Sequence, residues 1–271
     1  MKTRQTAIGH RAEPEWFAAW FDSTHYQTLY AHRNDEEAAG FVDQLAARLR
    51  PAAGATVLDL GCGTGRHARH LNARGLRVVG IDLSSESIRR AKEFETPDLW
   101  FRRQDMRLPF GHEVFDYVVN LFTSFGYFDD PSDDVAVIHN IARALKPGGV
   151  LVLDYLNVSY AERHLTPEED LTRNEMTYRI ARWTDVDHIF KRILVNSGGT
   201  VPREYVERVA KLTLQDFVFM FLLCDIELEA IYGNYRLEPF DVDTSPRLIL
   251  VAKKPSRPAR ISDATGSCEC G

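Results

Sequence analysis

The chain has 271 residues, 44% of them hydrophobic, which is enough for one large α/β domain or two small ones with a substantial core. The formal net charge of −6 argues against a protein that binds nucleic acid through a broadly basic surface. Residues 1–16 lack the apolar segment of a signal peptide, and no run of about 18 uncharged apolar residues occurs. We therefore expect a cytoplasmic protein with neither a membrane span nor a nucleic-acid partner.

Helical patterns precede the first predicted strand. The stretch "PEWFAAWF" at residues 14–21 places its four aromatic side chains on one helical face. The stretch "NDEEAAGFVDQLAARL" at residues 34–49 carries acidic residues in its first turn, as helices commonly do. We therefore predict two helices within residues 1–50.

Strands and helices alternate between residues 51 and 157. Short apolar runs rich in β-branched and aromatic residues each end in polar residues or glycine, and helical stretches such as "SSESIRRAKEF" and "PSDDVAVIHNIARAL" separate them. This alternation indicates a parallel sheet with helices on both faces, which is a doubly wound α/β core. The predicted strands are "TVLDLG", "RVVGIDLS", "LWFRRQD", "FDYVVNLF" and "GVLVLDYLN".

The regular alternation ends after residue 157. Residues 176–212 alternate with period two around the turn-forming "NSGG", which predicts a small antiparallel sheet inside an insertion at residues 158–212. Residues 213–256 begin with a helix, "LTLQDFVFMFLLCD", and continue with "IELEAIYG" and "PRLILVAKK" as the final strands of the core.

The C-terminal residues 257–271 have the composition of a disordered tail. Two of the four cysteines, Cys268 and Cys270, lie there without a second pair of ligands. His67 and His70 are three residues apart and have no acid between them, unlike the H-E-x-x-H zinc motif. We therefore expect no metal site.

A glycine-rich loop follows the first strand of the core. In "VLDLGCGTG", Gly61, Gly63 and Gly65 stand at alternate positions, where a backbone without Cβ atoms can pass close to a ligand at the end of the sheet. The dinucleotide fingerprint needs G-x-G-x-x-G, but residue 66 is arginine, and the Gly-Lys-Ser/Thr of a P-loop is absent. Asp59, two residues before the first glycine, would repel a pyrophosphate and attract an ammonium or a sulfonium. The loop therefore predicts a cationic ligand.

Acidic residues also end the next two strands. Asp82, 21 residues after Gly61, can accept hydrogen bonds from both hydroxyls of a ribose. Asp105 and Met106 suit an adenine amino group and the apolar face of its ring. The strand ends therefore favour a ligand that contains adenosine.

These motifs resemble, in order and spacing, those of class I S-adenosylmethionine-dependent methyltransferases. The resemblance is carried by "VLDLGCGTG", "GIDLS", "RRQDMRLPF", "FDYVVNLFTSFGYF" and "LKPGGVLVLDY", which cover about residues 55–156. It implies a Rossmann-like, doubly wound sheet of seven strands, mostly parallel with an antiparallel final strand. "NLFTSFGYF" is most similar to small-molecule methyltransferases that include sugar N-methyltransferases.

The resemblance implies S-adenosylmethionine as the cofactor and assigns roles to residues. The glycine loop faces the methionine part with Asp59 near its amino group, Asp82 binds the ribose, and Asp105 and Met106 contact the adenine. Asn120, Leu121 and Phe122 lie under the sulfonium, and residues 1–50 form a lid that contributes Tyr26 and Arg33. The full expected contact set is Asp59, Gly61, Cys62, Gly63, Gly65, Asp82, Leu83, Asp105, Met106, Asn120, Leu121, Phe122, Tyr26 and Arg33.

Methyl transfer from a sulfonium is a direct displacement, so the protein mainly aligns the reacting atoms in a dry pocket. A base is needed only if the nucleophile arrives protonated, and Tyr127, Asp154 and Tyr155 are the candidates for that role. We expect the acceptor to be an N or O nucleophile of a small molecule. A protein or RNA acceptor and a non-catalytic S-adenosylmethionine-binding module are the alternatives. "NLFT" stands where many base N-methyltransferases carry Asn/Asp-Pro-Pro-Tyr/Phe, which argues against RNA.

The insertion enters at the edge of the crevice where the acceptor must bind. We predict that its sheet forms one wall of the acceptor pocket. The alternative is a dimer interface, so the protein is expected to be a monomer or a homodimer. The side chains expected to contribute are Tyr178, Arg179, Arg182, Trp183 and Arg192.

Overall fold

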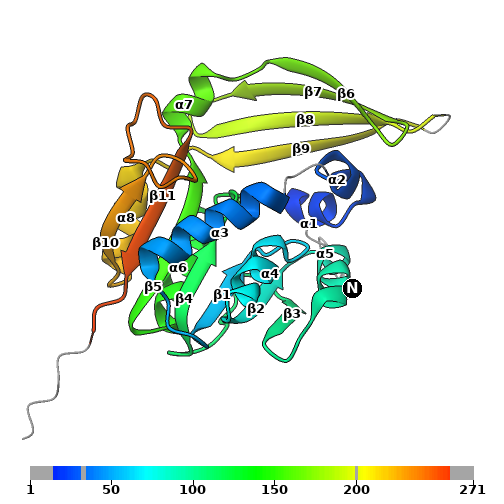
Figure 1. Cartoon of the computed structure of the whole chain (residues 1–271). Coiled ribbons are helices and arrows are strands. Elements are labelled where there is room, and N and C mark those ends of the chain that lie inside the picture. The colour runs from blue at the N-terminus through cyan, green and yellow to red at the C-terminus, as the bar shows by residue number, and fades with distance from the viewer. Residues whose placement is uncertain (1–14, 32–34, 199–200, 257–271) are drawn as a thin grey trace, which may run out of the picture.

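A computed structural model describes residues 15–31, 35–198 and 201–256, which form two β-sheets and the helices around them (Figure 1). The larger sheet has seven strands in the order β10-β11-β5-β4-β1-β2-β3. Every neighbouring pair is parallel except the two pairs that involve β11. The prediction of a seven-stranded, mostly parallel sheet with an antiparallel final strand is therefore confirmed. The strands are β1 (Thr56–Leu60), β2 (Arg77–Asp82), β3 (Leu99–Arg103), β4 (Phe115–Asn120), β5 (Leu145–Leu156), β10 (Glu227–Tyr232) and β11 (Arg247–Lys253).

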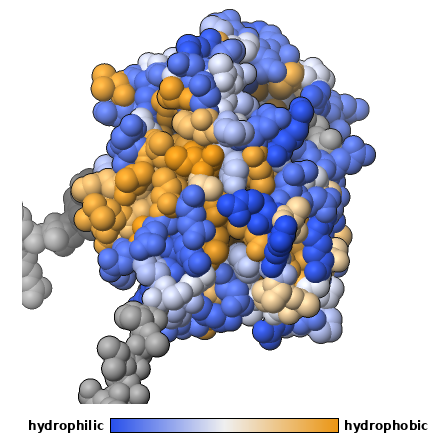
Figure 2. All heavy atoms as spheres, turned by 60° about the vertical axis from the view of Figure 1, so that its left-hand side comes forward, coloured by the Kyte–Doolittle hydropathy of each residue, from blue (hydrophilic) through white to orange (hydrophobic). Residues whose placement is uncertain are grey.

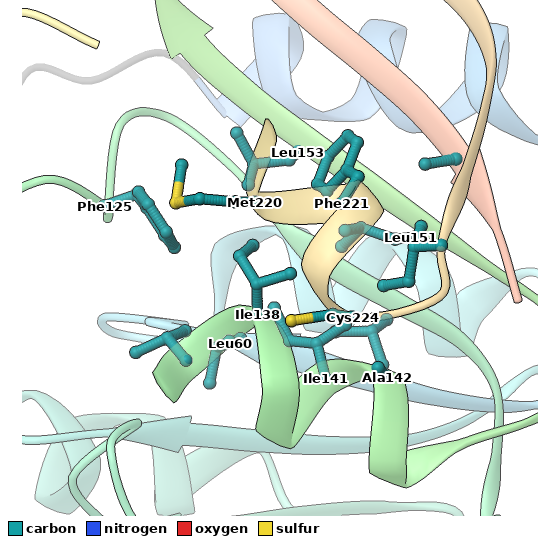
Figure 3. Packing of buried hydrophobic residues seen from close by; sticks show 14 of the residues in the cluster. Leu60, Phe125, Ile138, Ile141, Ala142, Leu151, Leu153, Met220, Phe221 and Cys224 are labelled. Atoms are coloured by element: carbon teal, nitrogen blue, oxygen red, sulfur yellow. The ribbon is translucent and has the colours of Figure 1, made fainter. Parts of the chain in front are cut away.

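Helices cover both faces of this sheet. One buried cluster joins side chains of α3, α4 and α5 to one face, and a second joins those of α1, α6 and α8 to the other. Figure 3 shows part of the second cluster, in which Met220, Phe221 and Cys224 lie over Ile138, Ile141 and Leu151. The helices are α1 (Trp16–Phe21), α2 (Thr24–Leu29), α3 (Asp35–Leu49), α4 (Arg66–Ala73), α5 (Ser85–Ala91), η1 (Lys92–Phe94), α6 (Pro131–Ala144), α7 (Val158–Arg163) and α8 (Leu214–Leu223).

The N-terminal region contains one more helix than the two predicted. Ser23 caps α2 by accepting a hydrogen bond from the backbone of Tyr26 at 3.1 Å. The helix has six residues and buries only Leu29, so its sequence carries almost no periodic signal.

The inserted sheet has four antiparallel strands in the order β6-β7-β8-β9. The predicted hairpin strands are present, and β6 is an addition. Its sequence, "EEDLTR", is mostly charged, which suits a partly solvated edge strand but hides it from a search for apolar alternation. The strands are β6 (Glu168–Arg173), β7 (Met176–Thr184), β8 (His188–Asn196) and β9 (Arg203–Ala210).

A third buried cluster joins the inserted sheet to the N-terminal helices. Trp20 and Leu29 of α1 and α2 pack against Tyr178, Ile180 and Ile193 of the sheet. The sheet and the two helices therefore form one packed unit beside the larger sheet (Figure 1).

One face of the molecule carries an apolar surface. Figure 2 shows it on the side where α8 and the edge strand β10 lie. Val218, Phe219, Leu222 and Leu223 of α8 are between 43% and 75% exposed, although Phe217 and Phe221 of the same helix are buried. Within the described residues, the helices are too short or too polar to span a membrane.

Candidate active site

A cavity of about 520 Å³ lies at the carboxyl ends of the core strands. Its volume is in the range of small-molecule sites. It is lined by the loops that follow β1, β2, β3 and β4, by residues of the helices α1 to α5, and by strand β9 of the inserted sheet. The cavity is therefore built where a doubly wound sheet binds ligands, and it is bounded by elements from outside the core.

The glycine loop forms the floor of the cavity. The backbone amides of Gly61 and Cys62 donate to the Ile81 carbonyl at 2.8 and 3.0 Å, which fixes the loop against β2. A Cβ atom on Gly61 would lie 2.6 Å from the Ser124 side chain, and one on Gly65 would lie 2.5 Å from the Phe101 ring. A Cβ on Gly63 would meet nothing within 4 Å. Gly61 and Gly65 are thus required by packing, whereas the space beside Gly63 is part of the cavity.

Asp59 lies under this loop and is only 1% exposed. Its Oδ2 atom is buried and has no hydrogen-bond partner among the described residues. Burial, assisted by the nearby charge of Asp82, raises the pKa of Asp59 to about 7. A buried carboxylate oxygen with no partner is the chemical complement of an ammonium group. Asp59 fits the amino group of S-adenosylmethionine in this respect, although it does not itself line the cavity.

Asp82 ends β2 at the wall of the cavity. Its carboxylate accepts hydrogen bonds from the backbone amides of Gly63 and Ser84, both at 2.8 Å. Burial raises its pKa, although these hydrogen bonds act in the opposite direction. Asp82 therefore holds the glycine loop and the start of α5 together while facing the ligand space, and its neighbour Leu83 also lines the cavity.

Asp105 and Met106 both line the cavity after β3. Arg107 donates to Asp105 at 2.6 Å and also pairs with Glu15 at 2.7 Å and Asp133 at 3.1 Å. Burial would raise the pKa of Asp105, but its hydrogen bonds with Arg107 outweigh burial and lower it. Asp105 is therefore a fixed, ionised acceptor.

The segment after β4 curves over the glycine loop. Asn120 is buried and donates from Nδ2 to the carbonyls of Leu60 at 2.8 Å and Ser124 at 3.3 Å. It therefore braces the loop and does not line the cavity, whereas Leu121 and Phe122 do. Phe122 has a left-handed backbone with φ of 64°.

The proposed base residues are separated by the fold. Asp154 is fully buried and accepts from the Phe122 amide at 2.9 Å, from Arg247 at 2.8 Å and from Tyr235 at 3.1 Å. The buried Tyr155 hydroxyl donates to the Ala210 carbonyl at 2.5 Å. Neither lines the cavity, because β11 and the inserted region cover this end of β5.

Tyr127 does line the cavity, with its hydroxyl donating to the Thr123 carbonyl. Its ring belongs to an aromatic wall formed with Trp16, Phe21 and Tyr26, which also line the cavity. The ring centroids of Trp16 and Tyr127 are 5.5 Å apart, those of Phe21 and Tyr127 are 5.3 Å apart, and those of Phe21 and Tyr26 are 5.0 Å apart. Arg33 lies outside the described residues.

The inserted sheet contributes to the cavity lining through residues other than the five predicted ones. Glu207 and Val209 of β9 line it. The five residues predicted for this wall do not: Tyr178 is buried in the cluster beneath α1 and α2, and Trp183 is 41% exposed and stacked on Phe190. The alternation of β9 alone could not reveal which of its faces meets the cavity.

Two further observations concern the predicted absence of a metal. His67 lines the cavity. Across residues 15–31, 35–198 and 201–256, no group of three His, Cys, Asp or Glu side chains could hold an ion. Cys268 and Cys270 lie outside these ranges.

The seven-stranded sheet has the Rossmann-like fold of methyltransferases. The structure superposes on an S-adenosylmethionine-dependent methyltransferase from Clostridium acetobutylicum with a TM-score of 0.71 and 17% identity, covering 89% of this chain and 98% of that one.

Sequence comparison gives the family. A methyltransferase-domain model matches residues 57–149. The chain is 28% identical to the cypemycin N-terminal methyltransferase of a Streptomyces species, over 80% of this chain and 90% of the relative. It is 31% identical to the dTDP-3-amino-3,4,6-trideoxy-alpha-D-glucopyranose N,N-dimethyltransferase of Streptomyces venezuelae, over 48% of this chain and 54% of the relative. Residues 57–149 therefore form a methyltransferase domain of the class I S-adenosylmethionine-dependent type, and S-adenosylmethionine is its cofactor.

Proposed function

We propose that this methyltransferase transfers the methyl group of S-adenosylmethionine to an amine nitrogen of a small molecule. The observation that carries the proposal is the composition of the cavity wall after β4. Residues 121–128 contribute aromatic, aliphatic and hydroxyl side chains to the lining but no histidine or carboxylate. A hydroxyl acceptor needs a nearby base, whereas an amine can lose its proton to water before it reacts. The wall after β4 therefore suits an amine. Glu207 of β9 also lines the cavity, but its Oε1 atom accepts from Trp20 and Tyr30 and its Oε2 atom lies 3.9 Å from the Lys191 ammonium, so it is a poor base.

The similar proteins support the same acceptor atom. One relative described above is named for methylation at an N-terminus and the other for N,N-dimethylation of an amino sugar. A cavity of about 520 Å³ also favours a small acceptor, or the end of a chain, over a folded macromolecule.

We assign the cofactor-binding roles on the geometry of the cavity. Asp59 is placed to compensate the cofactor's ammonium group, and Asp82 is placed to accept from its ribose. Asp105 and Met106 suit the adenine, and the backbone at Gly63 makes room for the methionine part. We retain Tyr26, Cys62, Leu83, Leu121 and Phe122 as cofactor contacts because all five line the cavity.

The bound cofactor supplies a methyl group already activated by a sulfonium. What remains for the chain is to orient the acceptor and exclude water. Trp16, Phe21 and Tyr127 offer an apolar wall for this purpose. Asp154 and Tyr155 are better assigned to supporting the loop after β4 and the inserted region than to taking a proton.

A labelled-methyl assay tests the proposal. The protein is incubated with methyl-labelled S-adenosylmethionine and matched pairs of small amines and alcohols, and products are identified by mass spectrometry. Label should appear on amines and not on the paired alcohols. Transfer to alcohols alone, or only to a folded protein or RNA, would contradict it. We further propose that the protein acts in the cytoplasm as a monomer or homodimer, which light scattering and fractionation can test.

A further inference from the structure

The cavity contains a carboxylate that the cofactor-binding assignment does not use. Glu207 lies on β9 of the inserted sheet and lines the cavity together with the glycine loop, and its side chain is 17% exposed. Strands β1 and β2 carry Asp59 and Asp82, and the loop after β3 carries Asp105, all of which we assign to the cofactor. Glu207 therefore comes from the inserted sheet, outside the core that we expect to bind the cofactor.

The orientation of Glu207 is fixed by neutral donors. Its Oε1 atom accepts from the indole nitrogen of Trp20 at 2.7 Å and from the Tyr30 hydroxyl at 2.8 Å. Lys191 is the cation beside it, with Nζ 3.9 Å from Oε2, at the outer limit of an ion pair, and Lys191 also donates to Tyr30. The two neutral hydrogen bonds hold the carboxylate in place, and Lys191 balances part of its charge from the outer limit of an ion pair.

Aromatic rings surround the same part of the cavity. The rings of Tyr26 and Tyr30 lie 4.8 Å apart, and Tyr26 contacts Phe21 at 5.0 Å. All three residues line the cavity with Glu207. A carboxylate among aromatic faces is a favourable environment for a protonated amine, which can form a charged hydrogen bond and lie against the rings.

We propose that Glu207 binds the amine of the acceptor and makes the site select amines over hydroxyl compounds of the same shape. This inference rests on the proposed function in one respect: it takes the amine bound by Glu207 to be the amine that is methylated. The bound amine first loses one proton to water. Its nitrogen lone pair then forms the new N–C bond while the S–C bond breaks and its electron pair stays on sulfur, so positive charge moves from sulfur to nitrogen. A carboxylate near the nitrogen stabilises that charge.

The test separates the charge of Glu207 from its role in packing. In Glu207→Gln, the amide oxygen can still accept from Trp20 and Tyr30, but the negative charge is lost. Glu204→Gln is the matched control, because Glu204 is on the same strand, is exposed and does not line the cavity. Both variants should keep the parental melting temperature and the parental affinity for S-adenosylmethionine.

The probes are phenethylamine and 2-phenylethanol, which have the same shape and differ in carrying an amine or a hydroxyl group. Their binding is measured by calorimetry with the protein saturated in S-adenosylhomocysteine, so that only the acceptor side is open. The parent and Glu204→Gln should bind the amine about tenfold more tightly than the alcohol or better, the size expected for a hydrogen bond to a charged group. Glu207→Gln should lose that preference.

Each outcome decides the proposal. Equal binding of the two probes by the parent, no binding of either, an unchanged preference in Glu207→Gln, or a loss of S-adenosylmethionine affinity in that variant would overturn it. Because this experiment measures binding and not turnover, a retained amine preference in a protein that methylates no amine would refute the proposed function and leave the role of Glu207 standing.

Discussion

The carboxylates of Asp59 and Asp82 lie on neighbouring parallel strands, close enough for the charge of Asp82 to add to burial in raising the pKa of Asp59 to about 7. Two acids near one another in a buried site are costly unless a cation joins them. The empty protein therefore carries an electrostatic penalty that a cationic ligand relieves.

This relationship predicts the pH dependence of cofactor binding. Below about pH 7, Asp59 is protonated and loses its attraction for the ammonium group of S-adenosylmethionine. The affinity should therefore rise between pH 6 and pH 8, up to about tenfold per pH unit where one proton is released. Calorimetry across this range measures it. Asp59→Asn should give a flat and weaker profile, and an unchanged pH profile in the variant would assign the effect to another group.

The same group predicts a change in stability. The pKa of Asp59 is higher in the folded protein than in the unfolded chain, so between the unfolded value near 4 and the folded value of about 7 the folded state binds more protons. The contribution of Asp59 to the free energy of unfolding therefore falls as the pH rises from about 4 to about 7. Asp59→Asn should raise the melting temperature of the ligand-free protein at pH 8, by about 2–4 °C per kcal/mol regained. A lower melting temperature than the parent would contradict the pKa argument.

Gly63→Ala should weaken cofactor binding without preventing folding. Its Cβ would enter the open space of the cavity, and φ is +54°. Gly54→Ala is the control for backbone strain, because Gly54 has φ of +73°, an equally open Cβ position and no part in the cavity. Both should lose about 1 kcal/mol of stability, while only Gly63→Ala loses affinity for S-adenosylmethionine, measured by calorimetry. Equal affinities in the two variants would mean that the ligand does not approach Gly63.

Asp82→Ala should weaken S-adenosylmethionine binding by about 2 kcal/mol or more, because it removes a charged acceptor and releases the amides of Gly63 and Ser84. Asp98→Ala is the control, since Asp98 is exposed and lies just before β3. NAD should bind neither the parent nor the variant. Unchanged affinity in a folded Asp82→Ala protein would place the ribose elsewhere.

Asp154→Ala should mainly affect stability. It leaves the Arg247 guanidinium, whose side chain is 19% exposed, without its carboxylate partner, and breaking a buried pair costs about 3–5 kcal/mol. The exposed pair of Asp170 and Arg179 is the control, and Asp170→Asn should cost less than about 1 kcal/mol. Denaturant unfolding measures both. Normal stability with complete loss of turnover would instead support Asp154 as a base.

The sequence identified the core and its loops because each depends on local patterns. Asp59 near the end of β1, the glycines after it and Asp82 at the end of β2 belong to two consecutive strands and share one edge of the sheet. Period-two alternation also revealed β7, β8 and β9. The charged β6 and the six-residue α2 carried too little pattern to be found.

The acceptor side of the cavity could not be predicted in the same way. Glu207 and Val209 reach it only because β9 packs against α1, a contact between segments almost 190 residues apart, as the bond from Trp20 to Glu207 shows with a separation of 187. Asp154 and Tyr155 stand at a strand end, as expected, but β11 and the carbonyl of Ala210 occupy the space around them. Both the exposure of Glu207 to the cavity and the burial of Asp154 and Tyr155 depend on segments distant in sequence, so local sequence patterns could not predict them.

The cluster formed by Trp20, Leu29, Tyr178, Ile180 and Ile193 is distinct from the two clusters that flank the larger sheet, and among the described residues only side chains of α1 such as Trp16 and Phe21 pack against both it and one of them. Elements that share a separate core tend to open together as a cooperative unit. Amide protons of α2, β7 and β8 should then exchange with solvent at one common rate, faster than those of β1 and β4. Since β9 carries Glu207 and α1 carries Trp16, one such opening would expose the cavity from two sides at once, giving a product a route out without unfolding of the cofactor-binding core.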